Sequence, residues 1–151
     1  MKNFHFSLNK VHKYQGQKRR LAEMELARCK SELDQSIQQL KELNHHFDEV
    51  TQASHAGMNQ GSQLTHAHRD LLEHLRTAIE FARQVVNQNM AKWQHTLAGV
   101  TAEKIRDESY EMLRRDERAA HTDAEQQAEG VTLSEIIMRQ WAFSEGENSN
   151  G

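Results

Sequence analysis

The stretch from Ala22 to Val50 constrains this chain most, because small and apolar residues recur in it at alternating steps of four and three. This spacing is an a/d heptad repeat, which places these residues along one narrow stripe of a single helix. Charged and amide side chains fill most of the other positions. Such a helix buries its stripe against a partner helix and leaves its other faces in water. The stripe consists of Ala22, Leu26, Cys29, Leu33, Ser36, Leu40, Leu43, Phe47 and Val50.

The composition favours very long helices. The chain of 151 residues contains no proline, although average usage of about 5% would supply roughly seven. Each proline in a helix interior costs about 3 kcal/mol, so this absence suits uninterrupted helices and argues against a loop-rich fold. Only 36% of the residues are hydrophobic. That is little material for a thick core, but it is enough for a thin helical structure.

A second stripe supplies the partner helix. Residues 51–63 include glycines, serines and an asparagine outside the heptad repeat, which is typical of a break between helices. We therefore predict a first helix over about 8–52, a tip over about 53–63 and a second helix over about 64–128. The second stripe consists, with one phase slip, of Leu72, Leu75, Ile79, Ala82, Val86, Met90, Trp93, Leu97 and Val100. The predicted fold is all-α, a long antiparallel two-helix coiled-coil hairpin that forms a single domain over residues 1–143.

Apolar residues continue beyond both stripes in a shifted phase. We expect them to extend the buried seam, after a stutter near residues 17–21 in the first helix. Ser7 is suited to cap the beginning of that helix. The residues in the shifted phase are Val11, Tyr14 and Leu21 in the first helix, and Ile105, Met112 and Ala119 in the second.

The end of the chain is expected to form a separate short helix. Gly130 predicts a break, and Thr132 with Glu135 forms a capping box ahead of a helical segment over about 133–141. This segment is unusually apolar, so it either packs back on the hairpin or docks on a partner. We expect residues 144–151 to be a disordered tail because of their composition.

Charge is distributed unevenly along the chain. Residues 1–30 carry eight Lys or Arg against two Asp or Glu, and residues 101–151 carry six against twelve. An antiparallel hairpin lays the basic beginning beside the acidic end, where each exposed pair contributes about 0–1 kcal/mol. The basic run therefore either only balances the second helix or binds an acidic protein partner. Nucleic acid is a weaker alternative, because interleaved aromatic residues are scarce.

No constellation of residues predicts catalysis or metal binding. Two histidine ligands on one helix face need a spacing of three or four, and no two of the ten histidines have it. The chain has no GxxxxGK(S/T) and no HExxH motif. The single cysteine, Cys29, lies on the stripe, which favours burial as a small apolar side chain. We expect a protein that is not an enzyme and that carries no metal or cofactor.

The sequence also predicts a soluble, cytoplasmic protein. Lys2 is not followed by the apolar segment of a signal peptide. No apolar run approaches the roughly 20 residues that a membrane-spanning helix needs.

Short motifs at both ends resemble the family of the flagellar export protein FliJ. The segment Leu133–Arg139 is similar to the Leu-Asp-Glu-rich end of that family, with Ser134 where Asp is commoner. Chain length, hairpin layout and the absence of proline extend the resemblance to nearly the whole chain. The motifs that resemble the beginning of the family are Phe4-His5-Phe6-Ser7-Leu8-Asn9-Lys10-Val11, Arg20-Leu21-Ala22 and Leu26-Ala27.

The resemblance implies a non-enzymatic stalk and adaptor, similar to the stalk subunit of rotary ATPases. Such proteins sit in the pore of the hexameric flagellar export ATPase, contact the transmembrane export-gate protein and escort export chaperones. The implied location is cytoplasmic, peripheral at the inner face of the cell membrane at the flagellar base. Two alternatives stay open: the equivalent stalk of a virulence injectisome, and a structural coiled-coil tether without an ATPase partner.

The resemblance also implies two sets of site residues, one at the helix-terminal end and one in the half near the tip. His46, Val50 and Leu71 stand where some family members carry aromatic residues, and Leu43 and Val50 are equally explained as seam residues. Arg19 and Arg20 are expected to lie off the seam. The ATPase-ring set is Lys10, Lys13, Lys18, Arg19, Arg20, Arg114, Arg115 and Arg118, together with the C-terminal segment. The export-gate set is Gln39, Leu43, His46, Val50, Leu71, Leu75 and Ala78.

Overall fold

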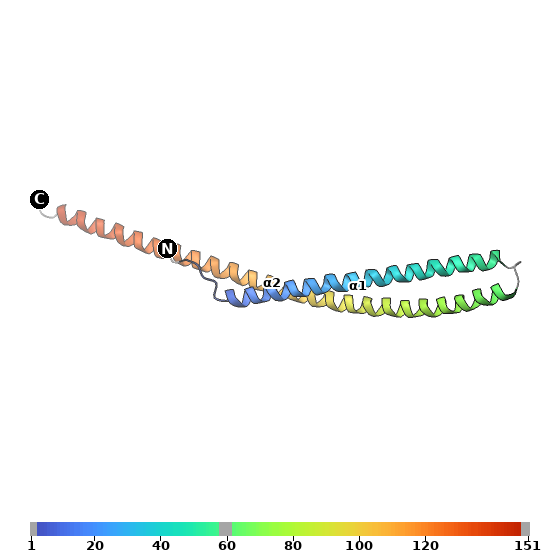
Figure 1. Ribbon diagram of the computed structural model, residues 1–151. Helices are drawn as coiled ribbons and strands as arrows, with labels where there is room; N and C mark the ends of the chain where they lie inside the picture. Colours follow the sequence, from blue (N-terminus) through green and yellow to red (C-terminus); the bar gives the residue numbers. More distant parts are fainter. Residues whose placement is uncertain (1–2, 58–61, 149–151) are drawn as a thin grey trace. The chain divides into compact units, whose positions relative to one another are not determined.

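The structure, a computed structural model, describes residues 3–57 and 62–148. Within these ranges it consists of two helices, α1 (Asn9–Ala56) and α2 (Ser62–Asn148), and no strand. The helices lie side by side and run in opposite directions (Figure 1). The predicted all-α helical hairpin is therefore confirmed. Its contacts divide it into two compact units, which are described in turn: Gln17–Lys104, and Met1–Gly16 with Ile105–Gly151.

The tip is shorter than the sequence pattern predicts. α1 continues to Ala56 and α2 already begins at Ser62, so residues 53–56 and 62–63 are helical. The amide of Gly57 still donates to the carbonyl of Ala53 at 2.9 Å, which completes the last turn of α1. Serine and histidine in this stretch are only weak helix breakers. The rest of the predicted tip, residues 58–61, lies outside the described residues.

The predicted break at Gly130 is wrong, because α2 runs without interruption to Asn148. The Thr132 hydroxyl donates to the carbonyl of Ala128 at 2.9 Å, which is a bond along a continuous helix and not a cap. The C-terminal segment is helical as predicted, but it is a continuation of α2. A glycine in a helix interior costs only about 1 kcal/mol relative to alanine, so good helix formers on both sides can tolerate it. Residues 144–148, predicted as tail, belong to α2, and residues 149–151 lie outside the described part.

The unit Gln17–Lys104 contains the predicted apolar seam. Cys29 and Leu33 are each 1% exposed, and they are the most deeply buried large side chains. Leu75, Ile79 and Val100 of α2 are buried against the same stripe. Most charged side chains stand outside the seam, so each helix buries one narrow face, as the heptad repeat requires.

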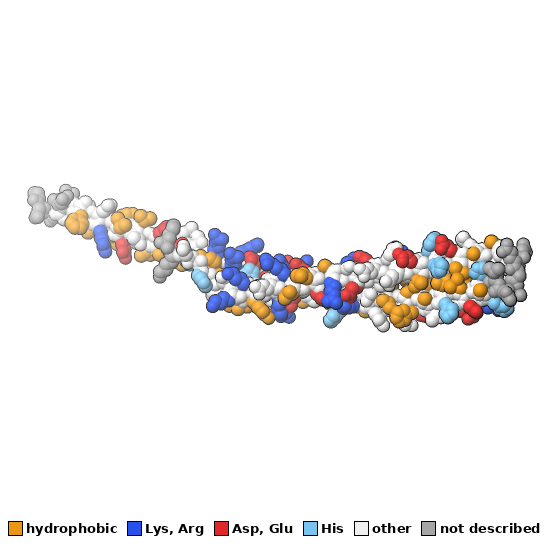
Figure 2. All heavy atoms as spheres, viewed as in Figure 1, with side chains coloured by type: hydrophobic (Ala, Val, Ile, Leu, Met, Phe, Trp, Pro, Cys, Tyr) orange, Lys and Arg blue, Asp and Glu red, His pale blue; other side chains and the backbone are white. Residues whose placement is uncertain are grey.

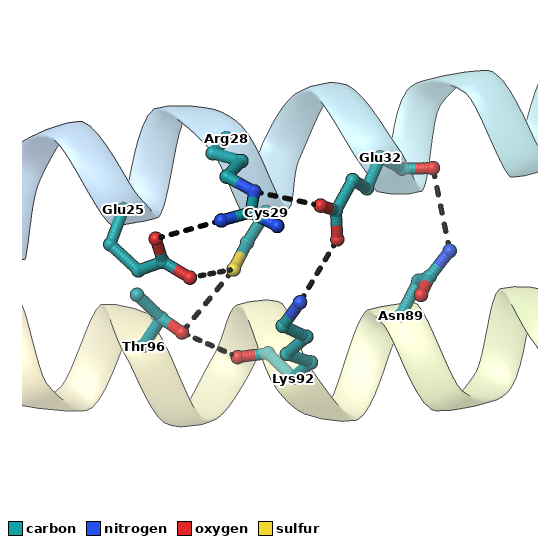
Figure 3. Close-up of polar contacts among 7 residues, drawn as sticks. All are labelled: Glu25, Arg28, Cys29, Glu32, Asn89, Lys92 and Thr96. Atoms are coloured by element: carbon teal, nitrogen blue, oxygen red, sulfur yellow. Dashed lines mark hydrogen bonds and ion pairs between the residues drawn. The ribbon is translucent and has the colours of Figure 1, made fainter.

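Polar groups at the centre of this unit connect the two helices and set their register (Figure 3). The Glu32 carboxylate of α1 accepts a hydrogen bond at 3.0 Å from Lys92 of α2 and another at 3.1 Å from Arg28. Asn89 of α2 donates at 3.4 Å to the backbone carbonyl of Glu32. The Cys29 Sγ atom lies 3.5 Å from the Thr96 Oγ1 atom. These contacts place Cys29 and Glu32 opposite residues 89–96, in antiparallel register.

The predicted phase slip in the second stripe does not occur. Leu97 is 39% exposed, whereas Asn89 and Thr96 lie half-buried at the interface. The apolar residues alone suggest a slip, because the seam positions 89 and 96 are polar. Polar side chains that find a partner across the interface fit the seam equally well, since the cost of burying them is offset by hydrogen bonds.

The unit of residues 3–16 and 105–148 has a mainly polar seam. Val11, Tyr14, Ile105 and Met112, which were expected to extend the apolar seam, are 43–64% exposed. The observed seam of α1 keeps the heptad phase of Ala22–Val50 and needs no stutter. Among the residues that are buried or half-buried instead are Phe6, His12, Gln15, Asp107, Tyr110, Glu117 and His121.

Candidate functional site

Five of the predicted ATPase-ring residues lie in the unit of residues 3–16 and 105–148, and all five are exposed. Arg114 lies 3.7 Å from Glu111 on the same helix. Within the described part of the chain, no carboxylate lies at ion-pair distance from the other four. Figure 2 shows Lys and Arg side chains gathered over the beginning of α1 and the part of α2 beside it. The five residues are Lys10, Lys13, Arg114, Arg115 and Arg118.

The remaining three ring candidates lie in the unit Gln17–Lys104 and differ from one another. Lys18 is 4.0 Å from Glu103 of α2, so it already has a partner within the hairpin. Arg19 is half-buried in the phase of the seam, and its Nε atom lies 3.8 Å from Glu23. The expectation that Arg19 lies off the seam is therefore wrong. Arg20 is exposed.

The basic beginning of the chain is balanced by the acidic end only in part. The ion pair of Lys18 with Glu103 and the contacts of His12 with two carboxylates follow the predicted polarity. Interhelical pairs of the opposite polarity also occur: Lys104 of α2 lies 4.0 Å from Glu23 of α1, and Lys92 of α2 lies 3.0 Å from Glu32 of α1. Several cations of the basic run are thus left facing solvent.

The predicted export-gate residues divide into buried and accessible members. Val50 and Leu75 are only 8% and 6% exposed, because both belong to the seam. No partner can reach them while the helices stay packed. Gln39 and His46 are exposed, and Leu71 is 38% exposed.

A hollow brings three of the gate candidates together. Gln39 and Leu43 of α1 and Ala78 of α2 line a space of about 190 Å³. The hollow exists because small side chains stand where a coiled coil usually places larger ones. Its size suits one large apolar side chain. The other lining residues are Ser36, Phe81, Ala82 and Val85.

Phe81 is the residue of this hollow that sequence reasoning missed. Its side chain is 67% exposed at the rim, which is unusual for an aromatic ring. A helical wheel drawn from Leu75 and Ile79 places Phe81 well off the seam, about 120° around the helix from Leu75. An isolated large aromatic residue off the seam has no structural role in a two-helix hairpin. Its position could therefore have identified Phe81 as a candidate binding residue from the sequence.

The last part of α2 presents an unpaired apolar face. Every residue from Gln126 to Gly146 is exposed, so this segment does not pack back on α1. Leu133, Ile137 and Trp141 follow one another at steps of four and are 58–69% exposed. Side chains at this spacing share one helix face. Ile136 and Phe143 widen the face.

The described ranges offer neither a cluster of metal ligands nor a helix suited to cross a membrane. No three or more His, Cys, Asp or Glu residues there are arranged to hold a metal ion. None of the helices, as far as the structure describes them, combines the length and the apolarity that a bilayer crossing requires.

The fold and its surfaces together define the class of protein. It is an all-α helical hairpin with exposed cations, an apolar hollow and an apolar terminal helix. The family model described as flagellar FliJ protein matches residues 4–146. The chain therefore belongs to the FliJ family and is a component of flagellar protein export. Neither the curated proteins nor the solved structures gave a significant match.

Proposed function

We propose that this protein is a non-enzymatic stalk and adaptor of the flagellar export apparatus. It binds in the pore of the hexameric export ATPase and links the ring to the transmembrane export gate and to export chaperones. These partners hold it at the inner face of the cell membrane. The observation that carries the proposal is the family match, which spans both helices from residue 4 to residue 146.

The exposed cations support the ATPase contact. Lys10, Lys13, Arg115 and Arg118 make no ion pair with the described residues, so they are available to acidic groups that line a ring pore. Such contacts steer an approaching partner and weaken with salt, because the Debye length is about 8 Å at physiological ionic strength. The apolar face that includes Ile137 adds a surface that buries well inside a pore.

The hollow beside Phe81 supports the gate contact. Gln39, Leu43 and Ala78 were assigned to the gate by resemblance, and the structure places all three around one hollow. An exposed aromatic ring beside a hollow of one side chain's size is the arrangement in which interface energy concentrates. Val50 and Leu75 act indirectly in this proposal, by holding the two helices together.

Two variants test the two contacts separately. ATP turnover by the partner ATPase and capture by the cytoplasmic part of the gate protein are measured for Lys10→Glu with Lys13→Glu, and for Phe81→Ala. We expect the charge reversal to abolish ATPase stimulation and to leave capture intact. We expect Phe81→Ala to weaken capture about thirtyfold or more, the effect of an interface hot spot, and to leave stimulation intact.

The control for the charge reversal is Lys41→Glu with Arg69→Glu, which changes charge equally at exposed positions of the other unit. Stimulation should fall with rising salt for the wild type and for this control. Equal stimulation by all variants would mean that the basic run serves only the hairpin. No stimulation by the wild type would favour the tether alternative.

A further inference from the structure

One side of α2 is occupied by α1 and by the segment that precedes α1. The His12 Nε2 atom lies 3.4 Å from Asp107 Oδ1. The Ser7 hydroxyl and amide donate to the two oxygens of Glu117, at 2.6 and 3.2 Å, instead of capping α1. Residues 105–121 of α2 therefore turn this side toward the beginning of the chain and leave the opposite side to solvent.

The opposite side of α2 carries an exposed apolar stripe. Ile105 and Met112 are 58% and 64% exposed, and residues seven apart share a helix face to within about 20°. Further steps of seven lead through two exposed positions to Leu133, where the apolar face of the terminal part begins. Hydrophobic side chains are visible along this last part of α2 in Figure 2. The back stripe of α2, as it is called below, consists of Ile105, Met112, Ala119, Gln126, Leu133, Ile137 and Trp141.

The two apolar ends of the back stripe match each other when a second copy of the chain runs antiparallel. A two-fold axis at the middle of the stripe places Ile105 of each copy opposite Trp141 of the other. It also places Met112 opposite the helical turn from Leu133 to Ile137. A two-fold contact uses the same surface on both copies, so each of these pairs forms twice. Two helices with matching stripes of this repeat bury them against each other.

The charges of this unit favour the same overlap. Residues 122–146 carry one Lys or Arg against five Asp or Glu, so two terminal parts repel each other, and an anionic membrane surface repels them as well. Residues 3–16 and 105–121 together carry six Lys or Arg against five Asp or Glu. The antiparallel overlap brings Arg115 beside Glu129 of the second copy, on the same flank of the stripe. Neither side chain makes an ion pair within the described part of its own chain.

We propose that this protein forms an antiparallel dimer through the back stripe of α2. The two Asp123 side chains approach each other at the axis, and this repulsion keeps the dimer reversible. The dimer stands on surfaces of this chain alone, whether or not the ATPase and gate assignments hold. It covers Arg115, one of the ring candidates, so a chain that binds in the ring as proposed above has to leave the dimer first.

Sedimentation velocity of the full-length protein over a concentration series tests the dimer. The wild type should show a reversible equilibrium between one and two chains. Met112→Glu and Ile137→Glu should each raise the dissociation constant about thirtyfold or more, because each places a charge among apolar side chains at two symmetry-related positions. The controls are Met138→Glu and Met24→Glu, which change methionines that are 75% and 69% exposed but lie off the stripe. Both should behave like the wild type.

A charge exchange identifies the register of the dimer. Arg115→Glu and Glu129→Arg should each weaken it about three- to tenfold, because each reversal acts at two exposed ion pairs. The double variant should restore wild-type affinity. The two residues lie about 21 Å apart along one helix, so this restoration requires a contact between two chains.

Three results would overturn the dimer. The first is a wild type that stays monomeric up to its solubility limit. The second is a dimer that Ile137→Glu dissociates and Met112→Glu does not, because the terminal parts would then pair with each other. The third is a double charge variant that is no tighter than the single ones. ATP turnover by the partner ATPase is a separate measurement, so a failure of the ring contact is distinguished from a failure of the dimer.

Discussion

At the scale of single residues, Glu32 is the centre of the contacts between the helices. The hydrogen bond from Lys92 of α2 contributes most to lowering the pKa of Glu32, and the bond from Arg28 contributes next. The same bond raises the pKa of Lys92. Each charge therefore stabilises the other, although both side chains are open to solvent and to screening by salt.

The sign of the pH dependence follows from these directions. Because the pKa of Glu32 is depressed in the folded state, its contribution to stability is present above the unfolded value and is lost as the pH falls through the folded value. Glu32→Gln should lower the thermal midpoint by no more than a few degrees at pH 7, and the difference from the wild type should shrink as the pH falls through the folded pKa of Glu32. Circular dichroism at 222 nm follows the transition.

The matched control is Asp34→Asn, which removes a carboxylate that lies 3.0 Å from Lys30 within α1 and does not reach α2. It should change the midpoint less than Glu32→Gln does at pH 7. A Glu32→Gln variant that is destabilised equally at pH 7 and pH 3 would show that charge is not the cause.

Apolar seam residues could be predicted from the sequence, but polar ones could not. Cys29 and Leu33 stand out because the heptad repeat marks apolar positions directly. His12, Asn89 and Thr96 follow the same spacing, yet each is acceptable there only because a partner on the other helix meets it. That partner depends on the register of the hairpin, which periodicity within one helix does not contain.

At the scale of elements, the main difference concerns the end of α2. Glycine and a capping-box pattern predict a break at Gly130, whereas α2 continues to Asn148. A capping box stabilises a helix beginning only where the preceding residues leave the helix. Here the preceding residues stay helical, and no proline enforces a stop. Local signals of this size are weak preferences, because they compete with the cooperativity of a long helix.

Substitutions at Gly130 test this continuity. A Cβ atom there meets nothing within 4 Å, so Gly130→Ala should raise protection of residues 122–148 from hydrogen exchange about two- to fivefold, the equivalent of 0.5–1 kcal/mol. Gly130→Pro should remove protection on both sides of the substitution, since proline breaks a helix interior. Gly99→Ala is the control, because Gly99 has equal space around it but lies in the paired part of α2. Unchanged protection in Gly130→Pro would mean that the helix is already broken there.

At the scale of the whole molecule, the antiparallel hairpin follows from two long matching stripes joined by a short connection. Two parallel helices in one chain would need a connection as long as the helices themselves.

The accessible parts of the candidate sites could not be predicted in the same way. Val50 and Leu75 carry the residue types of an interface, but burial within the hairpin removes them from the surface. Phe81 becomes a candidate only when α1 supplies the other side of the hollow.

An engineered disulfide tests the direction and register of the two helices together. Cys29 Sγ lies 3.5 Å from Thr96 Oγ1, and the two residues are 67 positions apart in the sequence. Thr96→Cys should therefore oxidise within one chain to a bond with Cys29, and closing a loop of this size stabilises by about 2–4 kcal/mol. Faster migration of the oxidised protein on a non-reducing gel and a higher thermal midpoint, both reversed by a reductant, are the expected results.

Thr101→Cys is the control, because Thr101 is exposed and its hydroxyl bonds only along α2, to Leu97. It should form no bond within the chain. A disulfide between two chains of Thr96→Cys, or none at all, would contradict the register that joins Cys29 to Thr96.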